Sequence, residues 1–243
     1  MTTPLSSFIK KKLLGVNKNL VSLNDPYVVM SQLLKKHEVT GIIDAGASTG
    51  RISRRLLRRF PRAQVYAFEP NPVFIKALQD YAVEDRRVLP QFVALSDHEG
   101  SAELYVTKAA GSSSLFAPGE RMKEMRPQGS SVVSMKKVEL VTIDQWAKRN
   151  GDPAIQLMKF DIQAGELQAL RGAVRVLQSS TLLVYAEVWF NHMYENGALF
   201  SEIDSFFRQY GFLLYDMYKL RYDTKGVIVS GCAIFVNAQK LGI

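Results

Sequence analysis

The sequence contains little cysteine and no long apolar run. Only one cysteine, Cys232, occurs among the 243 residues, which excludes an internal disulfide framework and a four-cysteine zinc site. The longest apolar runs, such as residues 182–186, are too short to cross a bilayer, so we expect no membrane span. No apolar stretch and no small-residue cleavage site follow the lysines near the N-terminus, which favours a cytoplasmic protein.

The remaining composition is that of an ordinary globular protein. Apolar residues account for 47% and charged residues for 22% of the chain, which argues against disorder. The length fits one large domain, or one domain with an appendage, and it is sufficient for a core that needs no structural metal. No internal repeat is visible, and no pattern indicates an oligomeric state.

The net charge is +8, from 31 Lys and Arg against 23 Asp and Glu. Much of this excess lies in one helical segment, residues 51–62, which carries six arginines. Such a segment indicates either an anionic partner, such as nucleic acid, or a solvated helix face. We favour the solvated face, because charge runs usually serve solubility.

Short β-branched runs alternate with helical patterns along most of the chain. Strands are predicted at residues 42–43, 64–68, 88–95, 155–160 and 181–188. Helices are predicted at residues 52–60, 72–81, 167–177 and 200–210, with Asn71 as the N-cap of the second. This alternation predicts an α/β fold with a doubly wound, mostly parallel sheet. Residues 212–218 and 227–236 have only a turn between them, which predicts an antiparallel hairpin at one edge of the sheet.

Two segments depart from this alternation. Residues 102–107 and 137–142 predict an inserted β-ribbon, and residues 108–135 between them are rich in Ser, Gly and Pro. A loop of this length is uncommon in a compact domain, and we interpret the insertion, about residues 102–141, as a lid. Four apolar residues of this loop could contact a ligand, namely Leu115, Phe116, Met122 and Met125. Residues 1–40 predict a helical extension before a main domain at residues 41–243, with Val28, Val29, Leu33 and Leu34 packing on the sheet or over the site.

The strongest local motif is IIDAGASTG, residues 42–50. An apolar strand ends in an acid, Asp44, and a turn of small residues then begins a helix. Gly46 permits a sharp turn and a close approach of ligand to backbone. In a doubly wound sheet this first turn lies at the ligand-binding crevice.

A second acid strengthens the nucleoside interpretation. Glu69 ends the next strand, 25 residues after Asp44, where a carboxylate can accept hydrogen bonds from both hydroxyls of a ribose. The turn lacks the GxGxxG spacing that suits the pyrophosphate of a nicotinamide cofactor. Asp44 before the turn would also repel a pyrophosphate, whereas it suits the ammonium and sulfonium groups of S-adenosylmethionine (SAM).

Several further motifs occur in the same order as in a known family. They are AFEPNP, FVALSDHEGSAELYV, GSSSL, VELVTIDQW, LMKFDIQAGELQALRGA, YAEVWFNHMY and GFLLYDMY. With IIDAGASTG they span about residues 41–236, and over this length the chain resembles the FkbM-type SAM-dependent methyltransferases. The resemblance implies a Rossmann-like class I methyltransferase fold with a seven-stranded sheet, and methyl transfer to oxygen on a sugar, glycan or natural product.

The sequence departs from this family at two places. Ser48 stands where the family usually has Asn, and Gln163 and Ala164 stand where it often has Glu or Gln followed by Gly. The first change keeps a small polar side chain. The second concerns the acceptor side of the site and leaves both SAM-binding acids in place.

The resemblance also implies roles for individual residues. The methionine and ribose parts of SAM would be bound by Asp44, Gly46, Ala47, Ser48 and Gly50. Glu69 would hold the ribose hydroxyls, and Pro70 would shape the turn. Ala94, Leu95 and Ser96 would frame the adenine edge. Asp161 and Glu187, at the ends of two strands, would face the same crevice near the methionine end and the acceptor, and His192 would follow in a short loop.

Methyl transfer to a hydroxyl needs a base within hydrogen-bond reach of the acceptor proton. His192 is the candidate by its ordinary pKa, and Asp161 or Glu187 could serve instead. Asp161, Glu187 and Asn191 could alternatively hold a divalent cation that lowers the pKa of the hydroxyl, so the metal stays unassigned.

Three other functions compete with this interpretation. An RNA methyltransferase would use the arginines of residues 51–62, but no separate RNA-binding segment is visible, so nucleic acid is disfavoured as a partner. A SAM-binding interaction protein without catalysis is disfavoured because both cofactor acids are present. A nicotinamide-dependent dehydrogenase is disfavoured by the spacing of the turn.

Overall fold

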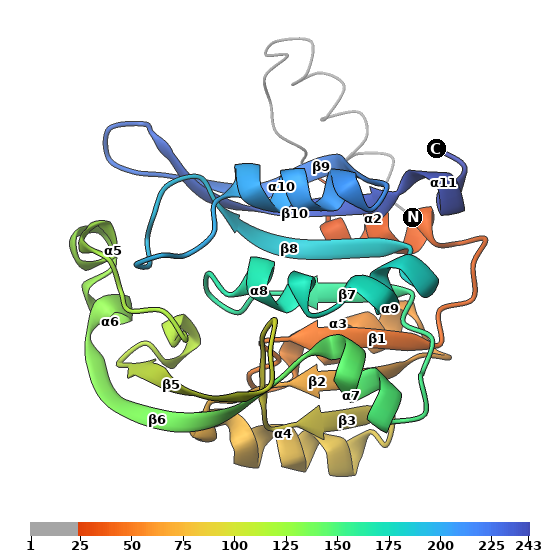
Figure 1. Cartoon of the computed structure of the whole chain (residues 1–243), viewed down its shortest axis with the longest axis horizontal. Helices are drawn as coiled ribbons and strands as arrows, with labels where there is room; N and C mark the ends of the chain where they lie inside the picture. Colours follow the sequence, from red (N-terminus) through yellow and green to blue (C-terminus); the bar gives the residue numbers. More distant parts are fainter. Residues whose placement is uncertain (1–23) are drawn as a thin grey trace.

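The computed structural model describes residues 24–243 of the chain, and residues 1–23 of the expected N-terminal extension lie outside that range. Seven strands form one sheet in the order β3-β2-β1-β7-β8-β10-β9. Their bounds are β1 Gly41–Ala45, β2 Gln64–Phe68, β3 Val88–Gln91, β7 Leu157–Phe160, β8 Leu183–Trp189, β9 Phe212–Tyr222 and β10 Ile228–Asn237. The first five are parallel, and β10 pairs antiparallel with both β8 and β9 (Figure 1). The doubly wound sheet with its terminal hairpin, expected from the sequence, is confirmed.

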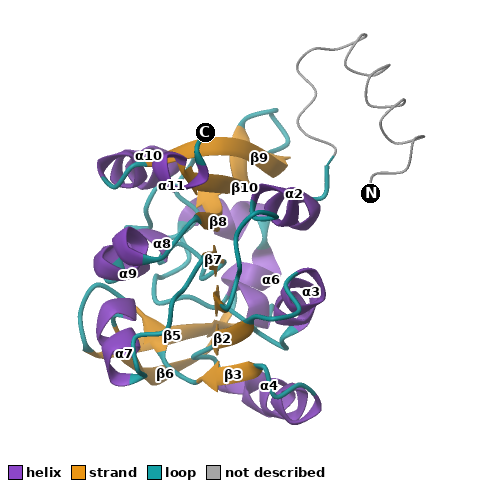
Figure 2. Ribbon diagram, turned by 90° about the vertical axis from the view of Figure 1, so that its right-hand side faces the viewer, coloured by secondary structure: helices purple, strands orange, loops and turns teal. Residues whose placement is uncertain are grey.

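Helices cover both faces of this sheet (Figure 2). One face carries α7, α8, α9 and α10, and the other carries α2, α3 and α4. Their bounds are α2 Pro26–Leu33, α3 Arg51–Arg59, α4 Pro72–Glu84, α7 Ile143–Arg149, α8 Glu166–Arg171, α9 Val174–Ser179 and α10 Phe200–Gln209, with α11 Ala238–Leu241 at the C-terminus. No helix within residues 24–243 combines the length and apolarity needed to cross a membrane.

Each face of the sheet has its own hydrophobic core, because successive strand residues point to opposite faces. Ile43 packs with residues of α7 to α10, whereas its neighbour Ile42 packs with α2, α3 and α4. Val29 and Leu34 are buried in this second core, so α2 packs on the sheet, one of the two placements expected for the N-terminal segment.

The inserted segment forms a second, three-stranded sheet in the order β4-β6-β5. Its elements are β4 Ala94–Leu95, β5 Gly100–Thr107, the 3-10 helix η1 Ala110–Ser112, α5 Glu120–Met125, α6 Pro127–Ser130 and β6 Val132–Val141. The antiparallel pairing of β5 with β6 is the predicted ribbon. The expected lid loop is therefore built from short helices that fold beside this ribbon (Figure 1).

Two sequence predictions of element boundaries are wrong. The strand expected at residues 88–95 is two strands, because β3 lies at the sheet edge and Ala94–Leu95 pair with β6 instead. The helix expected at residues 167–177 is interrupted at Gly172, which packs so closely that a Cβ atom there would lie 2.1 Å from the Ser96 carbonyl oxygen.

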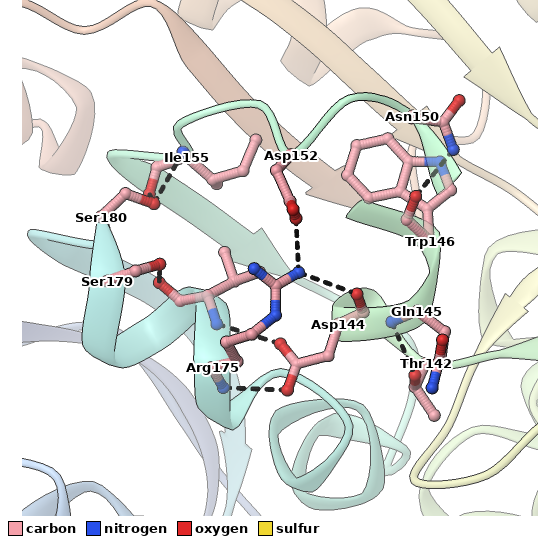
Figure 3. A network of polar contacts seen from close by, with 11 residues as sticks. Thr142, Asp144, Gln145, Trp146, Asn150, Asp152, Ile155, Arg175, Ser179 and Ser180 are labelled. Carbon is pink, nitrogen blue, oxygen red and sulfur yellow. Dashed lines mark hydrogen bonds and ion pairs between the residues drawn. The ribbon is translucent and has the colours of Figure 1, made fainter. Parts of the chain in front are cut away.

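A polar network then fixes the start of α9 against α7 (Figure 3). The Asp144 carboxylate accepts hydrogen bonds from the backbone N–H groups of Arg175 at 2.9 Å and Val176 at 3.0 Å. The Arg175 guanidinium in turn donates to the Asp144 carbonyl oxygen and pairs with Asp152. Since the first N–H groups of a helix lack partners within it, Asp144 supplies the cap from a different helix.

Candidate functional site

A cavity of about 250 Å³ lies between the Gly-rich turn, the ends of β2 and β7, β4 and the lid. It includes the gap where the sheet order reverses between β1 and β7, which is where open α/β sheets bind ligands. The predicted site residues that line it are Gly46, Ala47, Ser48, Glu69, Pro70, Ala94, Leu95 and Asp161. The predicted residues outside its lining are Asp44, Gly50, Ser96, Glu187 and His192.

The Gly-rich turn is pressed between β2 and β7. The N–H groups of Gly46 and Ala47 each donate to the Phe68 carbonyl oxygen at 3.0 Å. Gly46 has φ +73°, and a Cβ atom there would lie 2.0 Å from the Asp161 carbonyl oxygen. Only glycine fits this position, because both the backbone conformation and the space exclude a side chain.

Glu69 is held rigidly at the cavity wall. Its two carboxylate oxygens accept hydrogen bonds from the backbone N–H groups of Ser48 at 2.8 Å and Asn71 at 2.9 Å. Burial raises the pKa of this carboxyl, and the two backbone hydrogen bonds oppose that effect. Each oxygen keeps a further acceptor site, so the fixed carboxylate suits two adjacent hydroxyls such as those of a ribose.

Asp44 does not contact the cavity, contrary to the expected ligand role. Its side chain is fully buried, where it accepts a hydrogen bond from the Ser53 hydroxyl at 2.6 Å and pairs with Lys159 at 3.0 Å. Lys159 also donates to the carbonyl oxygens of Ala45 and Gly46. Burial alone would lower the pKa of Lys159, but the charges of Asp44 and Asp161 raise it. Asp44 therefore positions the turn through Lys159.

Gly50 and Ser96 also lie beside the cavity and do not line it. Gly50 has φ +75°, and a Cβ atom there would meet the Tyr81 ring at 2.4 Å. The N–H of Ser96 donates to the Val141 carbonyl oxygen at 3.0 Å and so extends the pairing of β4 with β6. Both residues shape the scaffold that supports the cavity.

The apolar wall contains residues that the sequence interpretation missed. Ala94 and Leu95 were expected there, and Phe74, Val93, Leu104 and Leu115 join them. Leu115 belongs to the GSSSL motif and to the apolar lid residues considered as ligand contacts, whereas Phe74 gave no signal beyond its helical pattern. An apolar slot of this kind suits a flat heterocycle such as adenine.

Polar contacts hold the lid over the cavity. The Asn71 amide donates to the Ser113 hydroxyl at 3.1 Å, and its amide oxygen caps α4 by accepting from the Val73 N–H. The Ser114 hydroxyl donates to the Gln163 carbonyl oxygen at 2.6 Å. The lid is thereby fastened both to the segment after β2 and to the loop after β7.

At the far end of the cavity, Gln163 joins two acids. Its amide nitrogen donates to Asp161 at 2.7 Å and to Glu187 at 2.6 Å, and its amide oxygen accepts from the Tyr194 hydroxyl at 2.7 Å. Asp161 is exposed, while Glu187 is buried. Burial and the neighbouring charges of Asp161 and Glu166 raise the pKa of Glu187 well above its ordinary value.

The side chains of His192 and Asn191 have backbone partners of their own. The His192 ring is exposed, with Nδ1 at 3.2 Å from the Gly197 carbonyl oxygen, and the Asn191 amide donates to the Ile228 carbonyl oxygen at 2.7 Å. Within residues 24–243, no group of three His, Cys, Asp or Glu side chains is arranged to hold a metal ion. The base role of His192 and the metal ligands Asp161, Glu187 and Asn191 stay predictions, with His192 outside the cavity lining.

The arginines of the basic segment hold α3 to its neighbours. Arg54 pairs with Glu84 at 3.0 Å and stacks on Tyr81, and Arg55 pairs with Asp25 and stacks on Tyr27. This arrangement agrees with a structural role for the segment in preference to an anionic partner. Arg51 differs, because it lines the cavity.

Comparison with known proteins identifies relatives of this chain. The model of the Methyltransferase FkbM domain matches residues 44–214. The 2-O-methyltransferase NoeI of Sinorhizobium fredii (strain NBRC 101917 / NGR234) is 28% identical over 189 residues, which cover 74% of this chain and 75% of that protein. Methyltransferase sdnD of Sordaria araneosa is 29% identical over 171 residues, which cover 61% of this chain and 66% of that protein.

Among solved structures, a Klebsiella pneumoniae protein described as an O-methyltransferase has a TM-score of 0.51 to this fold. It is 14% identical, and the match covers 90% of this chain and 83% of that chain. At this identity the likeness shows the fold alone, which is that of class I methyltransferases. Since the family model covers more than half of the sequence, the chain belongs to the Methyltransferase FkbM domain family and is a SAM-dependent methyltransferase.

Proposed function

We propose that this methyltransferase acts on a hydroxyl oxygen of a sugar, glycan or related natural product, with Asp161 as the base. The observation that carries the proposal is the position of Asp161, an exposed carboxylate that lines the cavity at its acceptor end. Bound SAM supplies a methyl group on a positively charged sulfur, which leaves as S-adenosylhomocysteine. The protein's own contribution is to orient the acceptor and remove its proton.

The cavity residues fit SAM in three parts. Glu69 accepts the ribose hydroxyls, because backbone hydrogen bonds fix its carboxylate. The slot between Phe74, Leu95 and Leu115 takes the adenine ring. Arg51, which also lines the cavity, is placed to pair with the carboxylate of the methionine part.

Asp161 is prepared as a proton acceptor by its neighbours. The Gln163 amide donates a hydrogen bond to it, which fixes the orientation of its carboxylate, and the same amide nitrogen donates to the neighbouring Glu187. With SAM bound, Asp161 would accept the proton that the acceptor hydroxyl loses as its oxygen takes the methyl group. Glu187 acts as a positioning residue, since it is buried, lies outside the cavity lining and accepts a hydrogen bond from the Gln163 amide that orients Asp161.

Two facts support oxygen over other acceptors. The relative NoeI is named as a 2-O-methyltransferase. The arginines that would favour RNA are partly neutralised, as Arg54 and Arg62 pair with Glu84 and Glu38.

The test is a methyl-transfer assay with labelled SAM against a panel of mono- and oligosaccharides, phenols and transfer RNA. We expect label in a base-stable methyl ether of a saccharide or phenol. Asp161→Asn should lower kcat by roughly 10²–10⁴-fold, the usual contribution of a general base, with SAM affinity nearly unchanged. His192→Ala is the control and should keep full activity. Labelled RNA, or loss of activity in His192→Ala but not in Asp161→Asn, would overturn the proposal.

A further inference from the structure

A second cavity, of about 360 Å³, shares no lining residue with the first. It is formed by the lid, the end of β8, the loop that follows β8, and the β9–β10 hairpin, with Arg126, Trp189, Arg221 and Tyr222 among its lining residues. These elements come from four separate parts of the sequence, so the folded chain alone brings two arginines and two large aromatic rings together.

The positive charge of this cavity is not neutralised. Within residues 24–243, the side chains of Arg126 and Arg221 have no ion pair or hydrogen bond. Arg121, on the same lid, is by contrast paired with Asp223 of the hairpin. The charge of Arg126 acts on the buried Glu187, but the two side chains form no ion pair in the described part of the chain.

The cavity walls also suit a sugar ring. Trp189 packs edge-on against Tyr194, with ring centroids 5.7 Å apart, and its indole N–H is buried with no hydrogen-bond partner in the described chain. The exposed ring of Tyr222 can pack against the C–H surface of a sugar, and a ligand oxygen reaching the buried Trp189 indole would supply the missing acceptor.

The two cavities are joined by neighbouring residues. Trp189 follows Glu187 by two positions on β8, so both side chains lie on one face of the sheet, about 7 Å apart along the strand. Tyr194, which packs on Trp189, also donates to Gln163 in the wall of the first cavity. A separation of this size matches the width of about one sugar ring.

We propose that the second cavity binds an anionic group of the acceptor through Arg126 and Arg221, while the hydroxyl to be methylated lies at Asp161 in the first cavity. The preferred acceptors are then glycans that carry a carboxylate, sulfate or phosphate. This inference rests on the proposed O-methylation, and it names the substrate class of that site. Arg126 makes the larger contribution, because it is partly buried whereas Arg221 is exposed.

The experiment has a binding part and a turnover part. In the first, the full chain saturated with S-adenosylhomocysteine is titrated with glucuronic acid, glucose 6-sulfate, glucose 6-phosphate and glucose. We expect the charged sugars to bind at least about tenfold more tightly than glucose, the size of one charge-assisted hydrogen bond. The ranking of the three charged sugars identifies the anion.

Variants separate this site from general basicity. Arg126→Gln should remove most of the preference for charged sugars, Arg221→Gln a smaller part, and the double variant all of it, with glucose binding unchanged. Arg59→Gln, which removes an exposed arginine of α3, is the matched control and should behave as the unmodified chain. In the turnover part, kcat/KM for charged acceptors should fall about tenfold in Arg126→Gln, while kcat/KM for neutral acceptors stays within about twofold.

The outcomes distinguish the two proposals. Equal binding of charged and neutral sugars, or a preference that survives in the double variant, overturns the anion site while leaving O-methylation standing. Charged-sugar binding that depends on Arg126, combined with methylation of RNA only, overturns the proposed function and with it the acceptor role of this cavity.

Discussion

At the scale of single residues, Glu166 is a carboxyl group enclosed in the core beneath the site. Its side chain is fully buried, and one oxygen accepts a hydrogen bond from the Ile162 N–H while the other has no partner within the described chain. Burial raises the pKa of Glu166 from 4.5 to about 7. The folded protein therefore holds a proton at pH 6 that the unfolded chain has released.

This difference predicts a pH-dependent stability. As pH rises from 4.5 to about 7, Glu166 lowers the free energy of unfolding, by up to about 3 kcal/mol, and above that range its effect is constant. The Glu166→Gln variant has no carboxyl at this position, so it does not lose this free energy of unfolding as pH rises. Its melting temperature relative to that of the unmodified chain should therefore rise between pH 5 and pH 8. A difference in melting temperature between the two proteins that stays the same at every pH would contradict the assignment.

Single residues also show where the sequence interpretation stopped. Asp44 and Glu69 both end apolar strands and were given similar roles, yet only Glu69 reaches the cavity. The reason is the register of β1 against β7, which sets Asp44 beside Lys159. That register joins residues 115 positions apart, and no local pattern in the sequence reports it.

At the scale of elements, the cap that Asp144 provides for α9 gives a direct stability prediction. Asp144→Ala removes the acceptor of two helix N–H groups and should lower the free energy of unfolding by about 1 kcal/mol, measured by chemical denaturation. Asp152→Asn is the comparison, because it removes only an exposed ion pair with the same Arg175 and should cost less than about 0.5 kcal/mol. Asn is chosen since Asp152 has φ +49°, which Asn tolerates. An equal loss in both variants would contradict the capping role.

The elements themselves were largely visible in the sequence. Alternating apolar periods located the five parallel strands, the hairpin and the ribbon, and the Asn71–Pro72 pair marked the start of α4. The predicted boundaries were wrong where long-range contacts determine them. An example is β4, whose two residues pair with a strand some 45 positions away. The lid helices were not predicted for a related reason. Their segment has little local helix signal, and Met122 and Gly129 pack on each other and on other elements.

At the scale of the whole molecule, two cavities share one row of polar residues. The first contains Glu69 and Asp161, and the second contains Arg126 and Trp189, with Gln163, Glu187 and Tyr194 between them. We propose from this arrangement that the cofactor binds at the β1–β7 gap and that the acceptor extends into the space between the lid and the hairpin. The residues of the second cavity lie far apart in the sequence, and only the fold brings them together.

The central claim is that SAM binds in the first cavity through Glu69, and calorimetric titration of the full chain tests it most directly. The account predicts binding of SAM and S-adenosylhomocysteine but not of NAD, with affinity at least about tenfold weaker in Glu69→Gln and unchanged in His192→Ala. Binding of NAD in place of SAM, or SAM binding that is equally tight in a folded Glu69→Gln protein, would contradict it.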